Sequence, residues 1–260
     1  MRRSMNILLY VIASVSLCLD GPALFQAISS EAQKPIVGNL ENLGPEWSAE
    51  LAQKKIGPRE LIELYQLGIA RPMFPWDRPH ILLVNGDRWP GQIVAIKDDQ
   101  IRFVPAFGKT QELTLPVSAV AIAWLTSPRA GELPDPTKSE LLALKRQDDE
   151  AYLINKDVLK GTVISMDRSG LKMDVNNKLV IVAMERLRAI AFNTELNKAI
   201  KSNVAIGLVT LTSGARIALT EASLQDGRIV GKALAGPEVR LILSEFLRLE
   251  VRSEIGRAHV

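Results

Sequence analysis

A strand–turn–strand pattern that occurs three times constrains this chain more than any other feature. In the first copy an apolar run leads into Asn85-Gly86-Asp87, and a longer alternating run follows. The second copy has Asn155-Lys156-Asp157 at the same place, and the third has Ser213-Gly214-Ala215. Asn-Gly is a strong hairpin signal, because a tight two-residue turn needs positive φ at both central positions. Recurrence of the pattern indicates one supersecondary unit used several times.

Each copy continues in the same way after its first hairpin. A second turn follows at Asp98-Asp99, at 168–170 and at Asp226-Gly227, and three short apolar runs complete the copy. Gly91 and Gly161 lie inside the long run, where an interior glycine indicates a bulge or a bend. Five short strands, one of them bent, predict an all-β chain: three tandem small SH3-like or Sm-like barrels with short connecting helices.

The third copy departs from this pattern. Ala215 stands where the other copies have aspartate, and Leu219 stands where they have the strand glycine. We therefore expect the same topology there, with a less sharply bent second strand. The predicted segments are a signal peptide (1–32), a linker with a helical segment (33–79), barrel repeat 1 (80–127), a linker with a short helix (128–149), barrel repeat 2 (150–193), a short helical linker (194–207), barrel repeat 3 (208–253) and a non-native tail (254–260).

Three short helices are expected between these segments. Residues 58–67 begin with a proline, are followed by Gly68 and have Leu61, Leu64 and Tyr65 at helical spacing, so they predict a helix that covers an open barrel end. A capping box at residues 137–140 predicts a second helix over Leu141-Leu-Ala-Leu144. Asn193 is the expected N-cap of a third helix over residues 194–200.

The N-terminus has the pattern of a secretory signal. Arg2-Arg3 precede an apolar run over residues 7–19, which is too short to span a hydrocarbon core of about 30 Å comfortably. Small residues at Ser30 and Ala32 predict cleavage after Ala32, and hence an exported protein of the periplasm, cell envelope or extracellular space. An uncleaved anchor is the alternative; otherwise no membrane span remains after cleavage. Lipidation at Cys18 is disfavoured, because Leu17 precedes it.

Charge and cysteine content exclude several classes of protein. Cys18 is the only cysteine, so no disulfide or cysteine-based metal site is expected after the signal peptide. The formal net charge is +3 and the basic residues are scattered, which argues against a nucleic-acid partner. The Lys145-Arg146 pair is interpreted as a solvated helix face.

No catalytic constellation can be assembled, so the chain is predicted not to be an enzyme and to need no cofactor or metal. The histidines are His80 and His259, and neither has a second ligand nearby. Asp87 and Asp157 recur at equivalent positions and could be an acid pair for glycoside hydrolysis. We interpret them as turn residues, whose side chains hydrogen-bond to their own turn.

Tryptophans are the candidate binding residues. Trp76 and Trp89 could each be an exposed platform on which a sugar ring stacks. The alternative is that they pack between the N-terminal segment and the first barrel. Trp124 aligns with Phe192 in the last strand of the copy and is expected in the core.

The C-terminal residues indicate a truncated chain. Ile255-Gly-Arg-Ala-His-Val260 can be back-translated into a widely used sequencing-adapter sequence. We therefore expect the native sequence to stop being represented near Ser253, with the rest of the protein following it.

Three segments carry a family resemblance, namely residues 82–91, 189–196 and 236–241. Together they resemble the N-terminal region of exported bacterial proteins that carry a carbohydrate-binding-like module of the NPCBM type downstream. The resemblance implies export and association with envelope or extracellular polysaccharide, without catalysis.

The expected function is that of a non-catalytic interaction or scaffold protein, the stem of a larger glycan-associated protein whose partner is a polysaccharide or an envelope protein. Two alternatives stay open. One is an extracellular glycan-processing enzyme with unidentified carboxylates, and the other is an Sm-like nucleic-acid binder.

Overall fold

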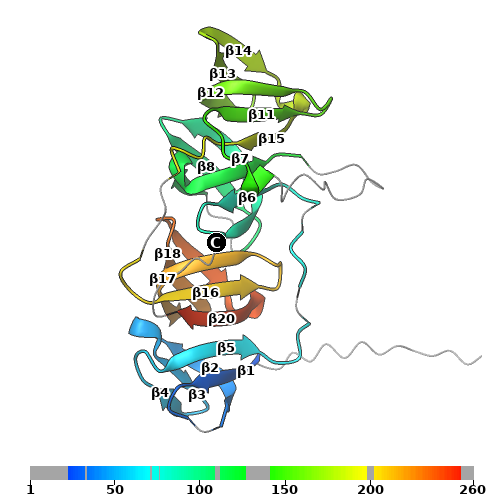
Figure 1. Cartoon of the computed structure of the whole chain (residues 1–260). Helices are drawn as coiled ribbons and strands as arrows, with labels where there is room; N and C mark the ends of the chain where they lie inside the picture. The colour runs from blue at the N-terminus through cyan, green and yellow to red at the C-terminus, as the bar shows by residue number, and fades with distance from the viewer. Residues whose placement is uncertain are drawn as a thin grey trace, which may run out of the picture.

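The computed structural model describes residues 23–32, 34–70, 72–75, 77–108, 112–126, 141–197 and 202–252. Its twenty strands confirm the predicted all-β class (Figure 1). Helical residues in the described part are limited to single 3-10 turns and residues 141–143. The described residues contain no helix with the length and apolarity needed to cross a membrane.

The strands fall into four consecutive groups of five, which we call units 1 to 4. Unit 1 contains β1 (Leu24–Ser29), β2 (Ile36–Leu43), β3 (Ala49–Leu51), β4 (Lys54–Ile56) and β5 (Leu61–Gln66). Unit 2 contains β6 (His80–Leu83), β7 (Arg88–Lys97), β8 (Gln100–Pro105), β9 (Leu113–Pro116) and β10 (Val120–Trp124). Unit 3 contains β11 (Asp149–Leu153), β12 (Val158–Asp167), β13 (Gly170–Val175), β14 (Lys178–Val182) and β15 (Leu187–Ala191). Unit 4 contains β16 (Ile206–Leu211), β17 (Arg216–Gln225), β18 (Arg228–Ala233), β19 (Glu238–Ile242) and β20 (Phe246–Arg252).

All four units have the same pairing order. The first strand pairs with the second and the fifth, the second pairs with the third, and the third pairs with the fourth, always antiparallel. In units 2 to 4 a single 3-10 turn leads from the fourth strand to the fifth: η2 (Val117–Ala119), η3 (Met184–Arg186) and η4 (Leu243–Glu245). Unit 1 has a turn at residues 58–60 instead, and η1 (Pro45–Trp47) between its second and third strands.

Unit 1 occupies the stretch in which the sequence predicted a linker and a helix. The helix predicted over residues 58–67 is wrong, because Leu61–Gln66 form β5. A bulge explains the error: Ser29 pairs with Leu61 and Ile28 pairs with Glu63, so Ile62 is an extra residue. The extra residue moves the buried face, so Leu61 and Leu64 are both buried at a spacing of three. A bulged strand therefore imitates the periodicity of a helix.

The first strand of unit 1 also bears on the signal peptide. β1 pairs with β2 and β5, and its Phe25 and Ala27 are fully buried. Cleavage after Ala32 would remove this strand, so the fold described here is that of a chain that retains residues 24–29. Residues 1–22, which hold the apolar run and Cys18, lie outside the described residues, as do residues 253–260, which include the predicted tail at 254–260.

The other two predicted helices have different outcomes. Residues 141–143 are helical, while the capping box at 137–140 lies outside the described residues. Residues 194–196 form a bend and Asn197 has no regular structure, so the described start of the helix predicted over 194–200 is not helical. Asn193 Oδ1 does accept a hydrogen bond from the Glu195 N–H at 2.8 Å, which makes it a local turn residue.

The first hairpin differs from the predicted two-residue turn. Leu83 and Asp87 close the loop, since the Leu83 N–H donates to the Asp87 carbonyl at 3.0 Å. Only Gly86 within it has positive φ, at 86°. The loop therefore has three residues with a left-handed last position. A two-residue turn with positive φ at both positions, which was not predicted here, occurs at the second turn, at Asp98 and Asp99.

In each unit the second strand contains an irregularity of the predicted kind. The register shifts between Ile93 and Ala95 in β7 and between Val163 and Ser165 in β12. Gly91 precedes the first shift with φ of 150°, and a Cβ there would lie 2.4 Å from the Val104 carbonyl oxygen. β17 is shifted as well, between Leu219 and Glu221, without any glycine in that strand.

The units do not follow one another in chain order. β5 pairs with β20, β17 pairs with β7, and β10 pairs with β15, so the stack runs unit 1, unit 4, unit 2, unit 3 (Figure 1). These pairings join with those inside the units into one antiparallel ladder of twelve strands: β2-β1-β5-β20-β16-β17-β7-β6-β10-β15-β11-β12. A single cluster of buried apolar residues extends through all four units.

Candidate functional site

The predicted tryptophan platform is not available at Trp89. Its side chain is fully buried and packs against Phe103 and Phe107, with ring centroids 6.3 and 6.0 Å away. A sugar cannot stack on a ring that no solvent reaches, so Trp89 is a core residue, and these ring contacts lie within unit 2 and not against the N-terminal segment. Trp76 lies outside the described residues. Trp124 is buried, as expected for the core.

His80 is a structural residue. Its side chain is buried, and Nδ1 lies 2.6 Å from the Arg78 carbonyl oxygen. The ring also contacts Phe74 edge-on and stacks near Trp124. No group of three or more potential metal ligands occurs in the described ranges. His259 lies beyond them.

Asp157 hydrogen-bonds within its own turn, as predicted, because its Oδ2 accepts from Asn155 Nδ2 at 2.6 Å, whereas Asp87 makes a contact outside its copy. The side chain that caps the first hairpin is Asn85, whose Oδ1 accepts from the Asp87 N–H at 3.1 Å; Asn155 does the same for Asp157 at 3.2 Å. Asp87 instead reaches into unit 4, where its Oδ2 accepts from the Ala218 N–H at 2.9 Å. Asp87 is 1% exposed whereas Asp157 is exposed. Asp87 therefore connects two units, which a pattern inside one copy could not reveal.

Burial gives Asp87 an unusual acidity. Desolvation raises the pKa of its carboxyl from 3.8 to about 6, although the Ala218 hydrogen bond and the nearby Arg216 charge oppose the rise. Side-chain hydrogen bonds from Asn85 and Trp89 also oppose the rise. The Asp87 carboxyl lies between units 2 and 4, where solvent is excluded. We therefore interpret its raised pKa as a result of unit packing and not as a sign of a catalytic acid.

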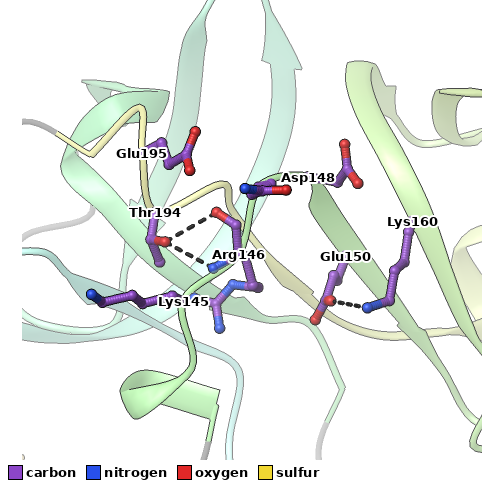
Figure 2. A pocket seen from close by; sticks show the side chains of 8 residues that line it. Lys145, Arg146, Asp148, Glu150, Lys160, Thr194 and Glu195 are labelled. Atoms are coloured by element: carbon purple, nitrogen blue, oxygen red, sulfur yellow. Dashed lines mark hydrogen bonds and ion pairs between the residues drawn. The ribbon is translucent and has the colours of Figure 1, made fainter.

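A charged depression next to the start of β11 is the best candidate for a binding site (Figure 2). Its volume is about 700 Å³, and it is lined by Lys145, Arg146, Gln147, Asp148, Glu150, Lys160, Thr194 and Glu195. Three of these side chains are basic and three are acidic. The lining comes from the segment before β11, from β11 and β12, and from the segment after β15.

Arg146 holds the two segments of the depression together. Its N–H donates to Thr194 Oγ1 at 2.9 Å, and that hydroxyl donates to the Arg146 carbonyl at 3.0 Å (Figure 2). The guanidinium donates from Nε to the Phe192 carbonyl at 3.1 Å and from Nη1 to the Leu141 carbonyl. Arg146 is 4% exposed, so its interpretation as part of a solvated helix face is wrong.

Glu150 is the electrostatic centre of the depression. Its Oε1 lies 2.9 Å from Lys160 Nζ, and its Oε2 accepts from the Tyr152 hydroxyl at 2.5 Å. Burial alone raises the pKa of Glu150, but the hydrogen bonds from Tyr152 and Lys160 and the Arg146 charge outweigh it, so the net pKa lies below 4.5. A carboxylate held ionised in this way is unsuited to donate a proton to a leaving group.

A second hollow lies where units 2 and 3 meet. Its volume is about 360 Å³, and its apolar lining includes Ile96, Val163, Ile164 and Leu196. Asp149 stabilises this corner, because its two carboxylate oxygens accept from the N–H groups of Val163 and Asn193, both at 2.8 Å. The hollow thus results from the packing of units 2 and 3. Its lining has no cluster of charged side chains like that of the depression near β11.

Sequence reasoning missed the depression because most of its members lie in two loops that are distant in the sequence. The charge run Lys145-Arg-Gln-Asp-Asp-Glu150 directly before a predicted strand was the available signal. The partners Lys160 and Thr194 enter only through the tertiary fold. Comparison of the chain with protein-family models, with curated protein sequences and with solved structures gave no match. The NPCBM-associated resemblance therefore stays a prediction.

Replacing Glu150 by glutamine should change the titration of Tyr152. Burial, and next the hydrogen bond and charge of Glu150, raise the pKa of Tyr152. In Glu150→Gln the charge is lost while the burial remains, so we expect the pKa of Tyr152 to fall but to stay above 10. Ultraviolet absorbance against pH measures it, and Tyr152→Phe assigns the transition. An unchanged transition would show that Glu150 does not contact this hydroxyl.

Proposed function

We propose that the chain is an exported, non-catalytic scaffold protein that holds a binding surface at a fixed position relative to the envelope. The twelve-strand ladder carries this proposal, because hydrogen-bonded strands connect every unit to the next. Strands in a sheet are about 4.8 Å apart, so the path along the ladder from β2 to β12 is about 50 Å. Linkers without such pairing would leave the units free to move independently.

Each unit is proposed to be a small SH3-like or Sm-like barrel. Two features support this proposal. The first strand pairs with both the second and the fifth, which curls the sheet back on itself, and the second strand is bulged in all four units. Only the junction between the fourth and fifth strands would remain open, where the chain makes a short turn in each unit.

The proposed ligand is a polysaccharide or another hydroxyl-rich polymer of the envelope. Support comes from the depression near β11, in which acidic, basic and amide side chains stand together and can donate to and accept from hydroxyl groups. The ionised Glu150 argues for binding in place of acid catalysis there. The family resemblance implies the same class of partner.

Small-angle X-ray scattering of the full chain tests the scaffold. We expect the profile of one elongated body in which the four units keep fixed relative positions. A profile typical of separate, independently moving units would contradict the proposal.

Co-sedimentation with insoluble polysaccharides, followed by a reducing-end assay, tests the ligand. We expect retention without release of new reducing ends. Retention should fall in an Asp148→Ala/Glu195→Ala double variant and persist in Glu185→Ala, an exposed acid elsewhere in unit 3. Release of reducing ends would favour the glycan-processing enzyme, and equal retention of all variants would remove the depression as the binding site.

A further inference from the structure

The ladder joins units in two ways, and both are locally symmetric. Where units 1 and 4 meet, Leu64 pairs with Leu249, and these residues each lie three positions into the fifth strand of their unit. Where units 2 and 3 meet, the equivalent residues Ala123 and Ile190 pair. Each junction of fifth strands therefore has a local two-fold axis.

The central junction uses second strands in the same manner. Arg88 pairs with Arg216, and each is the first residue of its second strand. Asp87, just before that strand, adds its hydrogen bond to the Ala218 N–H. The order of strand types along the ladder is therefore 2-1-5-5-1-2-2-1-5-5-1-2, and a second strand forms each end.

The end formed by β12 retains the features of the central junction. Its hairpin, Asn155-Lys156-Asp157, has the same capping hydrogen bond as the hairpin before β7. Residues 158–161 of β12 pair with β11 on one side, and none of the described strands pairs with them on the other. Val158 is 40% exposed and Ile154 is 45% exposed beside this edge. An open edge next to exposed apolar side chains can accept another strand.

We propose that two copies of the chain associate through the β12 edge, with Val158 of one copy paired to Val158 of the other across a two-fold axis. The contact reuses the geometry of β7 with β17. Asp157 takes the place of Asp87, and Lys160 takes the place of Ala218, so the Asp157 carboxylate of each copy accepts from the Lys160 N–H of the other. This inference goes beyond the proposed scaffold and holds whatever its ligand is.

Three residue differences make the contact between two β12 edges more favourable than the central junction between β7 and β17. The central junction places two arginines opposite each other, whereas the new one places two valines there, so no like charges meet. Unit 4 has Ala215 at the aspartate position, so the central junction has only one carboxylate hydrogen bond. In the symmetric dimer each copy would supply one Asp157 carboxylate, so two such hydrogen bonds would form.

The opposite end of the ladder cannot make the same contact. β1 and β2 are joined by the longer segment 30–35, without the tight hairpin. The turn at Ala52 lies against β2, such that a Cβ on Gly38 would be 2.5 Å from the Ala52 Cβ. With one competent end per copy, assembly closes as a dimer and does not continue into a filament.

Sedimentation velocity and light scattering on the full chain test the dimer. We expect the wild type to reach dimer mass by about 100 µM, at which an association with a micromolar Kd is largely complete. Val158→Lys should return the mass to that of a monomer, because two lysines would meet on the axis and, unlike Arg88 and Arg216 in the central junction, they would not be held together within one chain. Ile181→Lys is the matched control, since Ile181 is 61% exposed on β14 of the same unit, and it should remain dimeric.

Cross-linking provides an independent test. In a Cys18→Ser background, Val158→Cys should form an intermolecular disulfide on mild oxidation with oxidised glutathione, because paired antiparallel residues have Cα atoms about 4.5–5.5 Å apart. Ile181→Cys should not. A wild type that stays monomeric, a dimer that survives Val158→Lys, or equal cross-linking of both cysteines would overturn the proposal.

Discussion

In the wild type, the free energy of unfolding should fall by about 3 kcal/mol between pH 4 and pH 6 because Asp87 ionises. We expect this pH dependence to be absent in Asp87→Asn. The folded pKa of Asp87 is about 6 and the unfolded value is 3.8, and each pKa unit is worth about 1.4 kcal/mol. Below pH 4 both states are protonated and the full stability is present. As the pH rises, the unfolded chain ionises first, so stability falls until the folded carboxyl also ionises near pH 6. Asparagine does not ionise in this range.

Urea unfolding at pH values from 4 to 8 measures the effect. Asp157→Asn is the matched control, because Asp157 has the same turn position but is exposed in unit 3. Its pH profile should stay parallel to that of the wild type. Asp87→Ala is a second variant to measure. At pH 4 it should lower the free energy of unfolding by about 1–3 kcal/mol, since the Ala218 N–H loses its acceptor inside the junction. An unchanged profile in Asp87→Asn would mean that this carboxyl is solvated.

Trp47→Ala is expected to lower the free energy of unfolding by about 3–5 kcal/mol, the usual cost of removing a large buried aromatic ring. Trp47 is 2% exposed, and its Nε1 donates to the Ala205 carbonyl of the segment before β16 at 3.1 Å. The ring fills the space over Gly207, where a Cβ would lie 2.5 Å from the ring carbon Cη2. A residue of unit 1 thus completes the packing of unit 4.

Urea unfolding at constant pH measures the cost, with limited proteolysis of the 67–70 segment as a local probe. We expect faster cleavage there, because unit 1 loses one of its contacts with unit 4, while the pairing of β5 with β20 and the Glu63–Arg248 ion pair remain. Trp47→Phe should fall between the wild type and Trp47→Ala, since it keeps most of the apolar volume but not the N–H donor. Leu179→Ala, which removes a 63% exposed side chain, should change little. A cost below about 1 kcal/mol for Trp47→Ala would contradict the packing described.

The sequence was informative wherever structure depends on neighbours along the chain. The strands of units 2 to 4 and their turns follow from alternation and turn residues, and the second turn of unit 2 lies at Asp98-Asp99 as predicted. The strand irregularity that Gly91 and Gly161 predicted is present in β7 and in β12. These features depend on local geometry, which a short window of sequence contains.

Unit 1 escaped prediction for two physical reasons. β1 directly follows a segment that reads as a signal peptide, so its alternation is masked by the apolar run before it. In β5 the bulge at Ile62 gives buried positions at a spacing of three, which is also the spacing of a helix. The same bulge occurs at Arg188 in β15, but there the flanking copy pattern identified the strand.

The order of the units and the charged depression depend on contacts between distant segments. Nothing in the fifth strands states that β5 pairs with β20 and not with β10, because the four fifth strands share one pattern. The depression needs Glu150 and Lys160 to pair and Arg146 to hold Thr194, and the latter contact spans 48 positions. Composition predicted a solvated charge run there, and only the fold shows that Arg146 is buried.

The nested order of the units has a kinetic consequence. β5 is made early, but its partner β20 is made last, and the ion pair between Glu63 and Arg248 joins residues 185 positions apart. The strands at the unit 2–3 junction are much closer in sequence, so that pair can assemble first, at a lower entropy cost of loop closure. Unit 4 must then dock on two partners at once. Until it does, the β5 edge is open to chaperones, proteases and aggregation, so the rate at which unit 4 arrives governs how long the newly made chain is vulnerable.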